Sequence, residues 1–386
     1  MKEISTINGV VKIFAKTIED EAITQVRQFA SSPLGENAHI RIMPDAHVGA
    51  GCVIGTTMRI TDKVCPNIVG VDIGCGVDVV KTDINLAKRL PELDAVIRKK
   101  IPFGKEVHDK PQGYRELSRL RCWKQLGGRT TETAIRALGS LGGGNHFIEA
   151  YDDGYLAVHS GSRGIGFRVA LHYQNIAERN ARNKTIDVSA IPPTEREAFI
   201  KQNRDLPVID RELAYLTGDL MADYLHDMKI MQEFAVANRR AMLDAIANAM
   251  DGKIESRITS THNYIDLESM ILRKGATSAQ KDEELVIPLN MRDGLLVCVG
   301  KGNPDWNFSA PHGAGRLYSR RRAKEVLTLH DYQKSMAGIF STCICGDTLD
   351  EAPMAYKDWN EICDCIGPTV EIVKRLTPIY NFKASE

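Results

Sequence analysis

Residues 40–80 read IRIMPDAHVGAGCVIGTTMRITDKVCPNIVGVDIGCGVDVV, a series of short apolar runs broken by Gly, Pro and Asp. Such runs, separated by residues that favour turns, are typical of β-strands joined by tight turns. The reactive side chains of the stretch, Asp45, His47, Asp72 and Cys75, fall in these breaks. The stretch therefore predicts a β-rich framework whose chemistry is concentrated in its turns.

Apolar periodicity assigns most of the remaining chain to helices and further strands. The predicted elements are a capped helix that starts at Thr17–Asp20, a strand at Tyr155–His159 followed by a helix near Ile165, two helices within 209–250 broken near Gly218, a strand at 295–299 and a helix after Gly315.

The domain organisation is predicted from what the chain lacks. No internal repeat or low-complexity linker divides its 386 residues, and the candidate ligands are spread over about half of them. The polar, charged segments 103–128 and 178–207 are expected to be surface excursions. We expect one α+β domain over residues 1–386, with mixed sheets and helices around a cleft.

Composition constrains the partners and the compartment. Lys+Arg and Asp+Glu both number 50, so any nucleic-acid partner must be held by a local basic patch. The nine cysteines are an odd number, no signal peptide is recognised, and no apolar run approaches the about 20 residues of a membrane span. We expect a reduced, cytoplasmic protein without a membrane partner.

A metal site is predicted from five side chains. Asp72 and Cys75 share a turn with glycines, and His146, His159 and His262 lie beside Gly, Asn, Ser or Thr, where a cation can approach. A single histidine more often satisfies a buried polar group, but the shared context favours ligands. Thiolate and imidazole suit zinc, while the carboxylate keeps manganese open.

The stretch 309–316, Ser-Ala-Pro-His-Gly-Ala-Gly-Arg, sets His312 among residues too small to screen its imidazole. Such a histidine is a candidate nucleophile or anion ligand. Two glycine-containing segments, 142–145 and 160–164, offer backbone N–H groups and Arg163 for phosphate, or are simply solvated loops. The basic run that begins at Arg316 is either a solvent-exposed face or a grip for a polyanion.

Two weaker patterns are left open. Asp45 and His47 are either a hydrogen-bonded pair near the site or part of a turn. The pairs Cys343/Cys345 and Cys363/Cys365 lack the spacing of most structural zinc motifs, so they are either a second metal cluster or unconnected thiols.

Six motifs, taken in order, resemble those of the RtcB family of RNA ligases, and the similarity runs from about Met43 to Lys383. They are Val71-Asp72-Ile73-Gly74-Cys75-Gly76, Gly144-Asn145-His146-Phe147-Ile148-Glu149, His159-Ser160-Gly161-Ser162-Arg163-Gly164, Arg273-Lys274-Gly275-Ala276, His312-Gly313-Ala314-Gly315-Arg316 and Pro353-Met354-Ala355-Tyr356-Lys357-Asp358.

The resemblance implies the family's fold around a deep metal-containing cleft with two manganese ions. Cys75 would contact both ions, Asp72, His146 and His159 would complete their shells, and His262 would bind one of them. His312 would attack the α-phosphate of GTP and carry the guanylate.

The guanylate would then pass to an RNA 3′-phosphate, which can be formed by opening a 2′,3′-cyclic phosphate, and an RNA 5′-hydroxyl would displace GMP. This activity implies RNA repair or tRNA splicing, with an archease-like activator as a further partner. The cofactor-binding positions implied by the resemblance are Asn145, His146, Phe147, Ile148, Glu149, His262, Asn263, Asn290, His312, Gly313, Ala314, Gly315 and Lys383.

The chain departs from the family pattern at three places. Thr261 stands where many members have a second histidine, Ala50 stands where a lysine is usual, and residues 289–292, Leu-Asn-Met-Arg, replace a Gly-Ser-Met-Gly loop. These changes bear on the choice of RNA and on the contacts with guanine.

Two other functions compete with ligation. A metal-dependent RNA phosphodiesterase or cyclic-phosphate hydrolase could use the same ligands, but activated water would make a histidine nucleophile unnecessary. A non-catalytic RNA-binding relative would have no need for the ligands or for His312.

Overall fold

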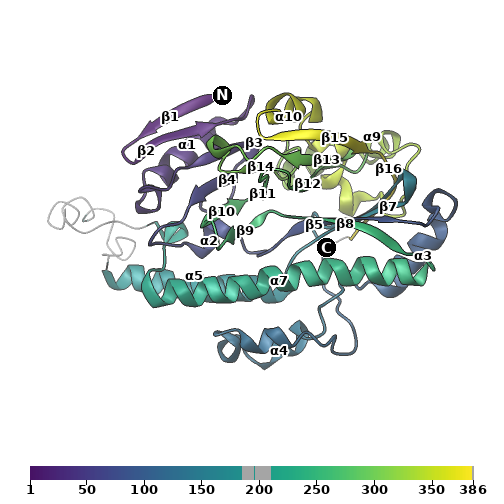
Figure 1. Ribbon diagram of the computed structural model, residues 1–386, viewed down its shortest axis with the longest axis horizontal. Helices are drawn as coiled ribbons and strands as arrows, with labels where there is room; N and C mark the ends of the chain where they lie inside the picture. Colours follow the sequence, from purple (N-terminus) through teal and green to yellow (C-terminus); the bar gives the residue numbers. More distant parts are fainter. Residues whose placement is uncertain (185–194, 196–209, 385–386) are drawn as a thin grey trace.

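The computed structural model describes residues 1–184, 195 and 210–384. Within these residues the strands form four sheets, and helices cover their outer faces (Figure 1). The protein is a mixture of α-helices and mostly antiparallel strands, which confirms the α+β prediction. Among the described helices, none combines the length and the apolarity that crossing a bilayer demands.

The central sheet has five antiparallel strands in the order β16-β6-β7-β5-β8. Their bounds are β5 Gly76–Thr82, β6 Phe147–Tyr151, β7 Tyr155–Ser160, β8 Ile254–Thr261 and β16 Pro378–Lys383. Gly76 at the start of β5 lies opposite Ser160 at the end of β7 and Thr261 at the end of β8. Because adjacent strands are antiparallel, the residues just beyond these ends meet at one edge of the sheet.

The other three sheets have six, two and three strands. The six-stranded sheet contains β1 Lys2–Thr6, β2 Gly9–Ile13, β3 Arg41–His47, β4 Ile54–Arg59, β10 Ile271–Lys274 and β9 Asn263–Asp266. The two-stranded sheet pairs β11 Ala276–Ser278 with β14 Ser309–Pro311, and the three-stranded sheet contains β12 Glu284–Asn290, β13 Gly294–Gly300 and β15 Val370–Leu376.

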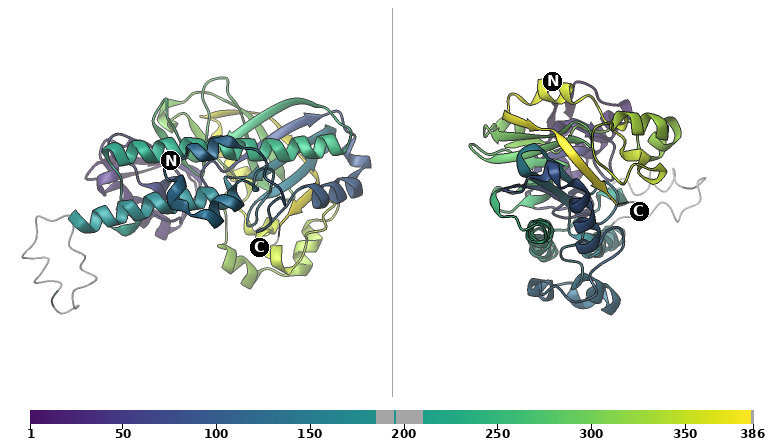
Figure 2. Two further views of the ribbon diagram at one scale, coloured as in Figure 1. Left: turned by 90° about the horizontal axis from the view of Figure 1, so that it is seen from below. Right: turned by 90° about the vertical axis from the view of Figure 1, so that its right-hand side faces the viewer.

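Helices pack on both sides of these sheets (Figures 1 and 2). They are α1 Asp20–Ala30, α2 Pro66–Val69, α3 Leu90–Lys100, α4 Gly128–Ala134, α5 Arg163–Lys184, α7 Gly218–Ala249, α8 Arg320–Val326, α9 Leu329–Ser335 and α10 Trp359–Ile366. The predicted strands at 155–159 and 295–299 correspond to β7 and β13, and the helices expected near Ile165 and after Gly315 correspond to α5 and α8.

The longest of the described helices, α7, packs against β5, β7 and β8 of the central sheet and beside α5 (Figure 1). The prediction of two helices broken near Gly218 is wrong. Gly218 has a φ of 54° and begins a single 32-residue helix, while the residues before it form only a short turn at Arg211–Leu213. The predicted apolar face is real, since Tyr224, Met228 and Met231 are fully buried.

The first helix differs from its prediction at its start. It begins at Asp20, and Glu19 at the preceding position makes no side-chain cap. The Thr17 hydroxyl, expected to cap this helix, instead donates to the Glu361 carboxylate. A sequence with several candidate capping residues in a row does not distinguish which of them caps the helix.

The two segments expected to be surface excursions differ in structure. Within 103–128, Leu117 and Cys122 are buried, and the Cys122 N–H donates to Asp227 of α7 (3.0 Å). Residues 178–184 continue α5, and 185–194 and 196–209 lie outside the described residues.

One buried ion pair connects α7 to the central sheet. The Arg239 Nε donates to the Asp78 carboxylate of β5 (2.8 Å), and both side chains are completely buried. The Arg239 Nη1 also donates to the carbonyls of Gly74 (2.8 Å) and Ser160 (2.9 Å). The guanidinium therefore satisfies several buried acceptors at once.

Replacing this arginine (Arg239→Ala) is expected to lower the free energy of unfolding by about 3–5 kcal/mol, because Asp78 would stay buried without its partner. Urea denaturation followed by circular dichroism measures the loss. Arg321→Ala, which removes the exposed Arg321–Glu325 pair, is the control and should leave the transition at its wild-type position. Equal transitions in the two variants would contradict the prediction.

Candidate active site and metal centre

The edge of the central sheet collects four side chains that were predicted as metal ligands. Cys75 immediately precedes β5, His146 precedes β6, His159 lies near the end of β7 and His262 follows β8. The antiparallel register brings these positions together although they span almost 190 residues of sequence. All four side chains are buried.

The ligand atoms of these residues point at one another. The Cys75 Sγ lies 3.6 Å from the His146 Nε2 and 3.3 Å from the His159 Nε2. The His262 Nε2 is 3.3 Å from the His159 Nε2, and an Asp72 carboxylate oxygen is 3.1 Å from the His146 Nε2. The donors of Cys75, His146 and His159 all lie within 4.8 Å of one another, a grouping that can hold a metal ion.

Backbone contacts orient the two central imidazoles. The His146 Nδ1 is 2.9 Å from the Leu141 carbonyl and the His159 Nδ1 is 3.1 Å from the Asn145 carbonyl. A ring that donates from Nδ1 to a carbonyl keeps its Nε2 lone pair for a metal ion. The Ser162 N–H in turn donates to the Asp72 carboxylate (2.9 Å).

Burial controls the protonation of this cluster. It lowers the pKa of His159 and of His262 well below the usual imidazole value, which keeps both rings neutral. Burial, reinforced by the Asp72 charge, raises the pKa of the Cys75 thiol well above its usual value. Burial is also the largest single influence on Asp72 and acts to raise its pKa, but the hydrogen bonds from His146, Cys75 and Ser162 and the charge of His146 together lower it.

The chemistry of this donor set fits a divalent cation. Neutral imidazoles and an ionised carboxylate are the forms that bind metal, and a cation would favour the thiolate that burial alone opposes. Among the described residues, Cys343, Cys345, Cys363 and Cys365 belong to no such group, so the hypothesis of a second metal cluster is not supported.

His312 follows β14 and lies beside the cluster. Its ring centroid is 4.9 Å from that of His262. Its Nδ1 is 2.6 Å from an Asp45 carboxylate oxygen, which also accepts the His312 backbone N–H (3.1 Å). Asp45 is completely buried at the end of β3 and accepts the Nδ1 proton, so the Nε2 lone pair of His312 is available for attack.

This pairing decides between the two interpretations of the Asp45 segment. Asp45 acts next to the site, through His312, while the His47 Nδ1 contacts only the Asp45 backbone carbonyl (3.1 Å). The sequence could not name the partner, because Asp45 and His312 are 267 positions apart.

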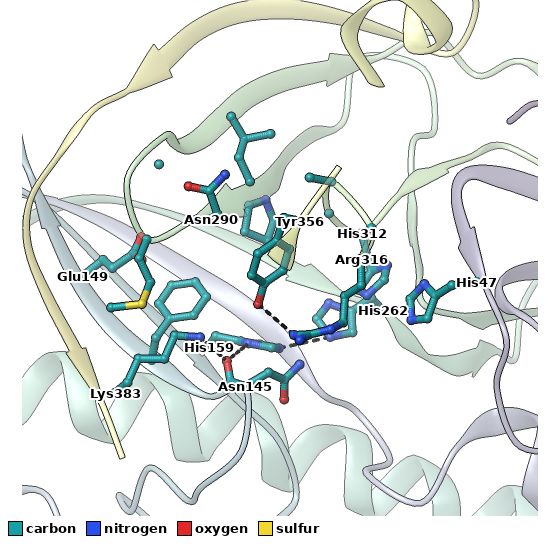
Figure 3. Close-up of a pocket in the computed structure, with 18 of the residues that line it drawn as sticks. His47, Asn145, Glu149, His159, His262, Asn290, His312, Arg316, Tyr356 and Lys383 are labelled. Atoms are coloured by element: carbon teal, nitrogen blue, oxygen red, sulfur yellow. Dashed lines mark hydrogen bonds between the residues drawn. The ribbon is translucent and has the colours of Figure 1, made fainter. Parts of the chain in front are cut away.

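A cavity opens in front of His312 (Figure 3). Ten of the predicted cofactor-binding residues line it: Asn145, Phe147, Glu149, His262, Asn290, His312, Gly313, Ala314, Gly315 and Lys383. Three do not line it. His146 lies in the metal cluster, Ile148 is packed in the core, and the Asn263 side chain accepts the Gly275 N–H (3.0 Å).

Glu149 is the acidic group of this cavity. Burial raises its pKa to about 7, although hydrogen bonds from Tyr151 and Asn381 and the charge of Lys383 act in the opposite direction. The Tyr151 hydroxyl lies 2.5 Å from its carboxylate. A single carboxylate that is held by neutral donors can accept paired N–H groups from a ligand.

Residues that the predicted site did not include complete the cavity wall. Arg316 and Tyr356 line it, and the Glu351 carboxylate beneath them binds Arg316 (3.2 Å), the Tyr356 hydroxyl (2.6 Å) and Lys383. Burial opposes ionisation of Glu351, but the charges of Lys383 and Arg316 lower its pKa to about 2. The sequence signal that could have identified Arg316 and Tyr356 as site residues is that each lies within one of the six family-like motifs.

The three departures from the family pattern lie in different surroundings. Leu289 lines the cavity, whereas Arg292 is not among its lining residues and pairs with Asp293 (2.9 Å). The Thr261 hydroxyl accepts from Arg239 (3.5 Å), and the Ala50 carbonyl accepts from the buried Lys274 ammonium. Leu289 and Asn290 are therefore the departing residues that directly change the cavity wall.

The glycine run at 142–144 supports the site without lining this cavity. Gly142 has a φ of 95°, and an added Cβ there would lie 2.1 Å from the Arg163 Nη1 and 2.7 Å from the His146 Nδ1. Only glycine fits between these two side chains. The run therefore packs around His146, in addition to any contact that it makes with phosphate.

Comparison with known proteins identifies the family. The family model described as "tRNA-splicing ligase RtcB" matches residues 25–126 and 116–384. The chain is 29% identical to "RNA-splicing ligase RtcB1" of Escherichia coli, covering 98% of both chains. It is 27% identical to "tRNA-splicing ligase RtcB" of Aeropyrum pernix, covering 95% of this chain and 92% of the relative.

A second Escherichia coli protein, "RNA-splicing ligase RtcB2", is 27% identical over 95% of this chain and 93% of its own length. The family model and these relatives together span nearly all of the described residues, including every segment that builds the metal cluster and the His312 cavity. The chain belongs to the RtcB family of RNA ligases.

Proposed function

We propose that the protein is a GTP- and manganese-dependent RNA ligase that joins a 3′-phosphate or 2′,3′-cyclic phosphate to a 5′-hydroxyl. The observation that carries the proposal is the His312–Asp45 pair (2.6 Å) next to the Cys75, His146 and His159 cluster. A nucleophile and a metal site that border one cavity fit nucleotidyl transfer, in which a phosphate must be held close to the attacking atom.

In this reaction GTP is a substrate and His312 is the nucleophile. The His312 Nε2 attacks the α-phosphorus, so a nitrogen–phosphorus bond forms while the bond to pyrophosphate breaks. Asp45 holds the Nδ1 proton and stabilises the positive charge that develops on the ring. The open loop at 313–315 gives the ribose phosphate room to approach.

The metal is proposed to be two manganese ions. Cys75 would be shared between them, with Asp72, His146, His159 and His262 as the remaining protein ligands. Bound there, the ions would neutralise negative charge on the reacting phosphates. The mixed thiolate, imidazole and carboxylate donors support a divalent cation, and the choice of manganese rests on the family assignment.

The second half of the reaction follows from the family assignment. The guanylate passes from His312 to an RNA 3′-phosphate, and the RNA 5′-hydroxyl then displaces GMP and seals the strand. The names of the relatives support RNA or tRNA splicing as the setting, and RNA repair is the alternative setting that we propose. We place the protein in the cytoplasm, which is consistent with its nine cysteines, all of them unpaired in the described chain. An archease-like activator is a further proposed partner.

A cyclic-phosphate hydrolase is the competing function, and His312 distinguishes the two. A hydrolase would use activated water and would have no use for a histidine oriented by a buried carboxylate. A covalent nucleotide on His312 is therefore specific to the ligase.

Guanylylation provides the direct test. Incubation with GTP and manganese should add one guanylate to the wild type, as measured by intact mass, and His312→Asn should carry none while still binding metal. Asp45→Asn should slow formation of the adduct by about 100-fold or more, because the ring loses its charged acceptor. An adduct that persists in His312→Asn, or that maps to a lysine, would refute the proposal.

Metal binding is expected to depend on the thiol at the centre of the cluster. Cys75→Ser should lose most of its bound manganese and all ligation, with an unchanged circular dichroism spectrum, because the site lies in turns at the sheet edge. Elemental analysis after dialysis measures the metal. Cys345→Ser, at an exposed cysteine, is the matched control, and full metal content in both variants would contradict the ligand assignment.

Selection of guanine is expected to depend on pH through Glu149. Its carboxylate can accept the N1–H and N2–H groups of guanine only when ionised, and the pKa of Glu149 is raised to about 7 by burial. GTP affinity should therefore fall as the pH decreases from 8 to 6, over the window set by that pKa.

Isothermal titration of GTP and ATP across this range measures the effect. Glu149→Gln removes the titrating group, so the variant should bind GTP weakly at every pH and lose its preference over ATP. A variant that retains the wild-type pH profile would show that another group is responsible.

A further inference from the structure

The positive charges of the basic run that follows His312 are largely neutralised by neighbouring carboxylates. The surface pocket beside α8 is lined by cations together with four carboxylates. Arg321 pairs with Glu325 (3.0 Å) and Lys324 pairs with Asp350 (3.4 Å). A polyanion would have to displace these carboxylates, so this face is a poor place to bind one.

A second pocket has the opposite character. It lies between α4, the start of α5 and the segment 104–107, and we call it the α4–α5 pocket. Its charged lining residues are Lys105, Arg129, Arg163 and Arg168, and none of the described residues that line it is acidic. In a chain with no net charge, this is a concentrated patch of one sign.

Three of these cations have no competing partner. Lys105, Arg129 and Arg168 are exposed, and none of them forms an ion pair with another residue in the part of the chain that the structure describes. Each can therefore contact a phosphate without breaking an ion pair. The Arg168 guanidinium lies over the ring of the neighbouring Phe167 (6.0 Å to the centroid). Arg163 differs, because its guanidinium donates to the Ser140 hydroxyl (3.0 Å) and to the Gly104 carbonyl (2.9 Å).

Arg163 connects this pocket to the metal centre. The preceding residue, Ser162, donates its N–H to Asp72, and Arg163 packs against Gly142, close to the His146 ring. The α4–α5 pocket and the metal cluster therefore share a wall. The half-exposed ring of Phe167, one position before Arg168, adds a surface on which a base can stack.

We propose that the α4–α5 pocket binds the phosphate backbone of the RNA substrate, with Lys105, Arg129 and Arg168 as the phosphate contacts. The identification of the polyanion as RNA rests on the proposed function, whereas the existence of an anionic-backbone site rests on the pocket alone. The contacts are electrostatic, so they hold RNA of any sequence and position its end near the metal centre.

The test compares two triple variants. Lys105→Ala/Arg129→Ala/Arg168→Ala removes the proposed contacts, and Lys99→Ala/Lys100→Ala/Lys253→Ala removes three exposed lysines elsewhere and is the charge-matched control. The probe is a fluorescent single-stranded RNA of about 16 nucleotides with a 3′-phosphate, titrated without GTP at several salt concentrations.

The first variant should bind this RNA about tenfold or more weakly, and the slope of log affinity against log salt should fall by about 2, since each single-strand phosphate contact contributes about 0.7. The control should match the wild type. Arg129→Lys/Arg168→Lys, which keeps the charges, should retain the wild-type slope.

Equal losses in the two triple variants, or no loss in the first, would overturn the inference. Guanylylation of His312 by GTP without RNA should be unchanged in the first variant, which shows that its active site is intact. If the wild type bound RNA through this pocket but formed no guanylate, the ligase proposal would fail while this inference stood.

Discussion

The fold and the site both depend on one buried guanidinium. Arg239 of α7 forms an ion pair with Asp78 inside the central sheet and also donates to the carbonyls of Gly74 and Ser160. These carbonyls adjoin Cys75 and His159, the two residues at the centre of the metal cluster. Because the planar guanidinium fixes several acceptors in one geometry, the positions of the ligands are set by the packing of α7 on the sheet.

The ligand set could be predicted from sequence because its signal is local. Cys75 and the three histidines stand beside small residues that let a cation approach, and antiparallel strands then bring their ends together. The position of Arg239 carries no comparable signal. Within a long amphipathic pattern it is one polar residue among several, and only the packed helix shows that it points into the sheet.

The remaining features depend on contacts between distant segments. Asp45 could be recognised as reactive, but its partner lies 267 positions away. The sequence leaves two interpretations of the basic run after His312 open, and its carboxylate partners decide between them: Glu325 lies within the run, but Asp350 comes from a distant segment. The sequence predicts a break at Gly218 because glycine can either interrupt or start a helix, and the φ of 54° at Gly218 shows that it starts one.

The same long-range pairing has a consequence for how activity arises during folding. The strand that bears Asp45 shares a sheet with β10 from the second half of the chain, and β16 near the end completes the central sheet next to β6. Contacts of such high sequence separation close slowly, after helices and hairpins have formed. An early compact intermediate would therefore possess most of the secondary structure but no aligned nucleophile, and catalytic competence would report the completion of folding.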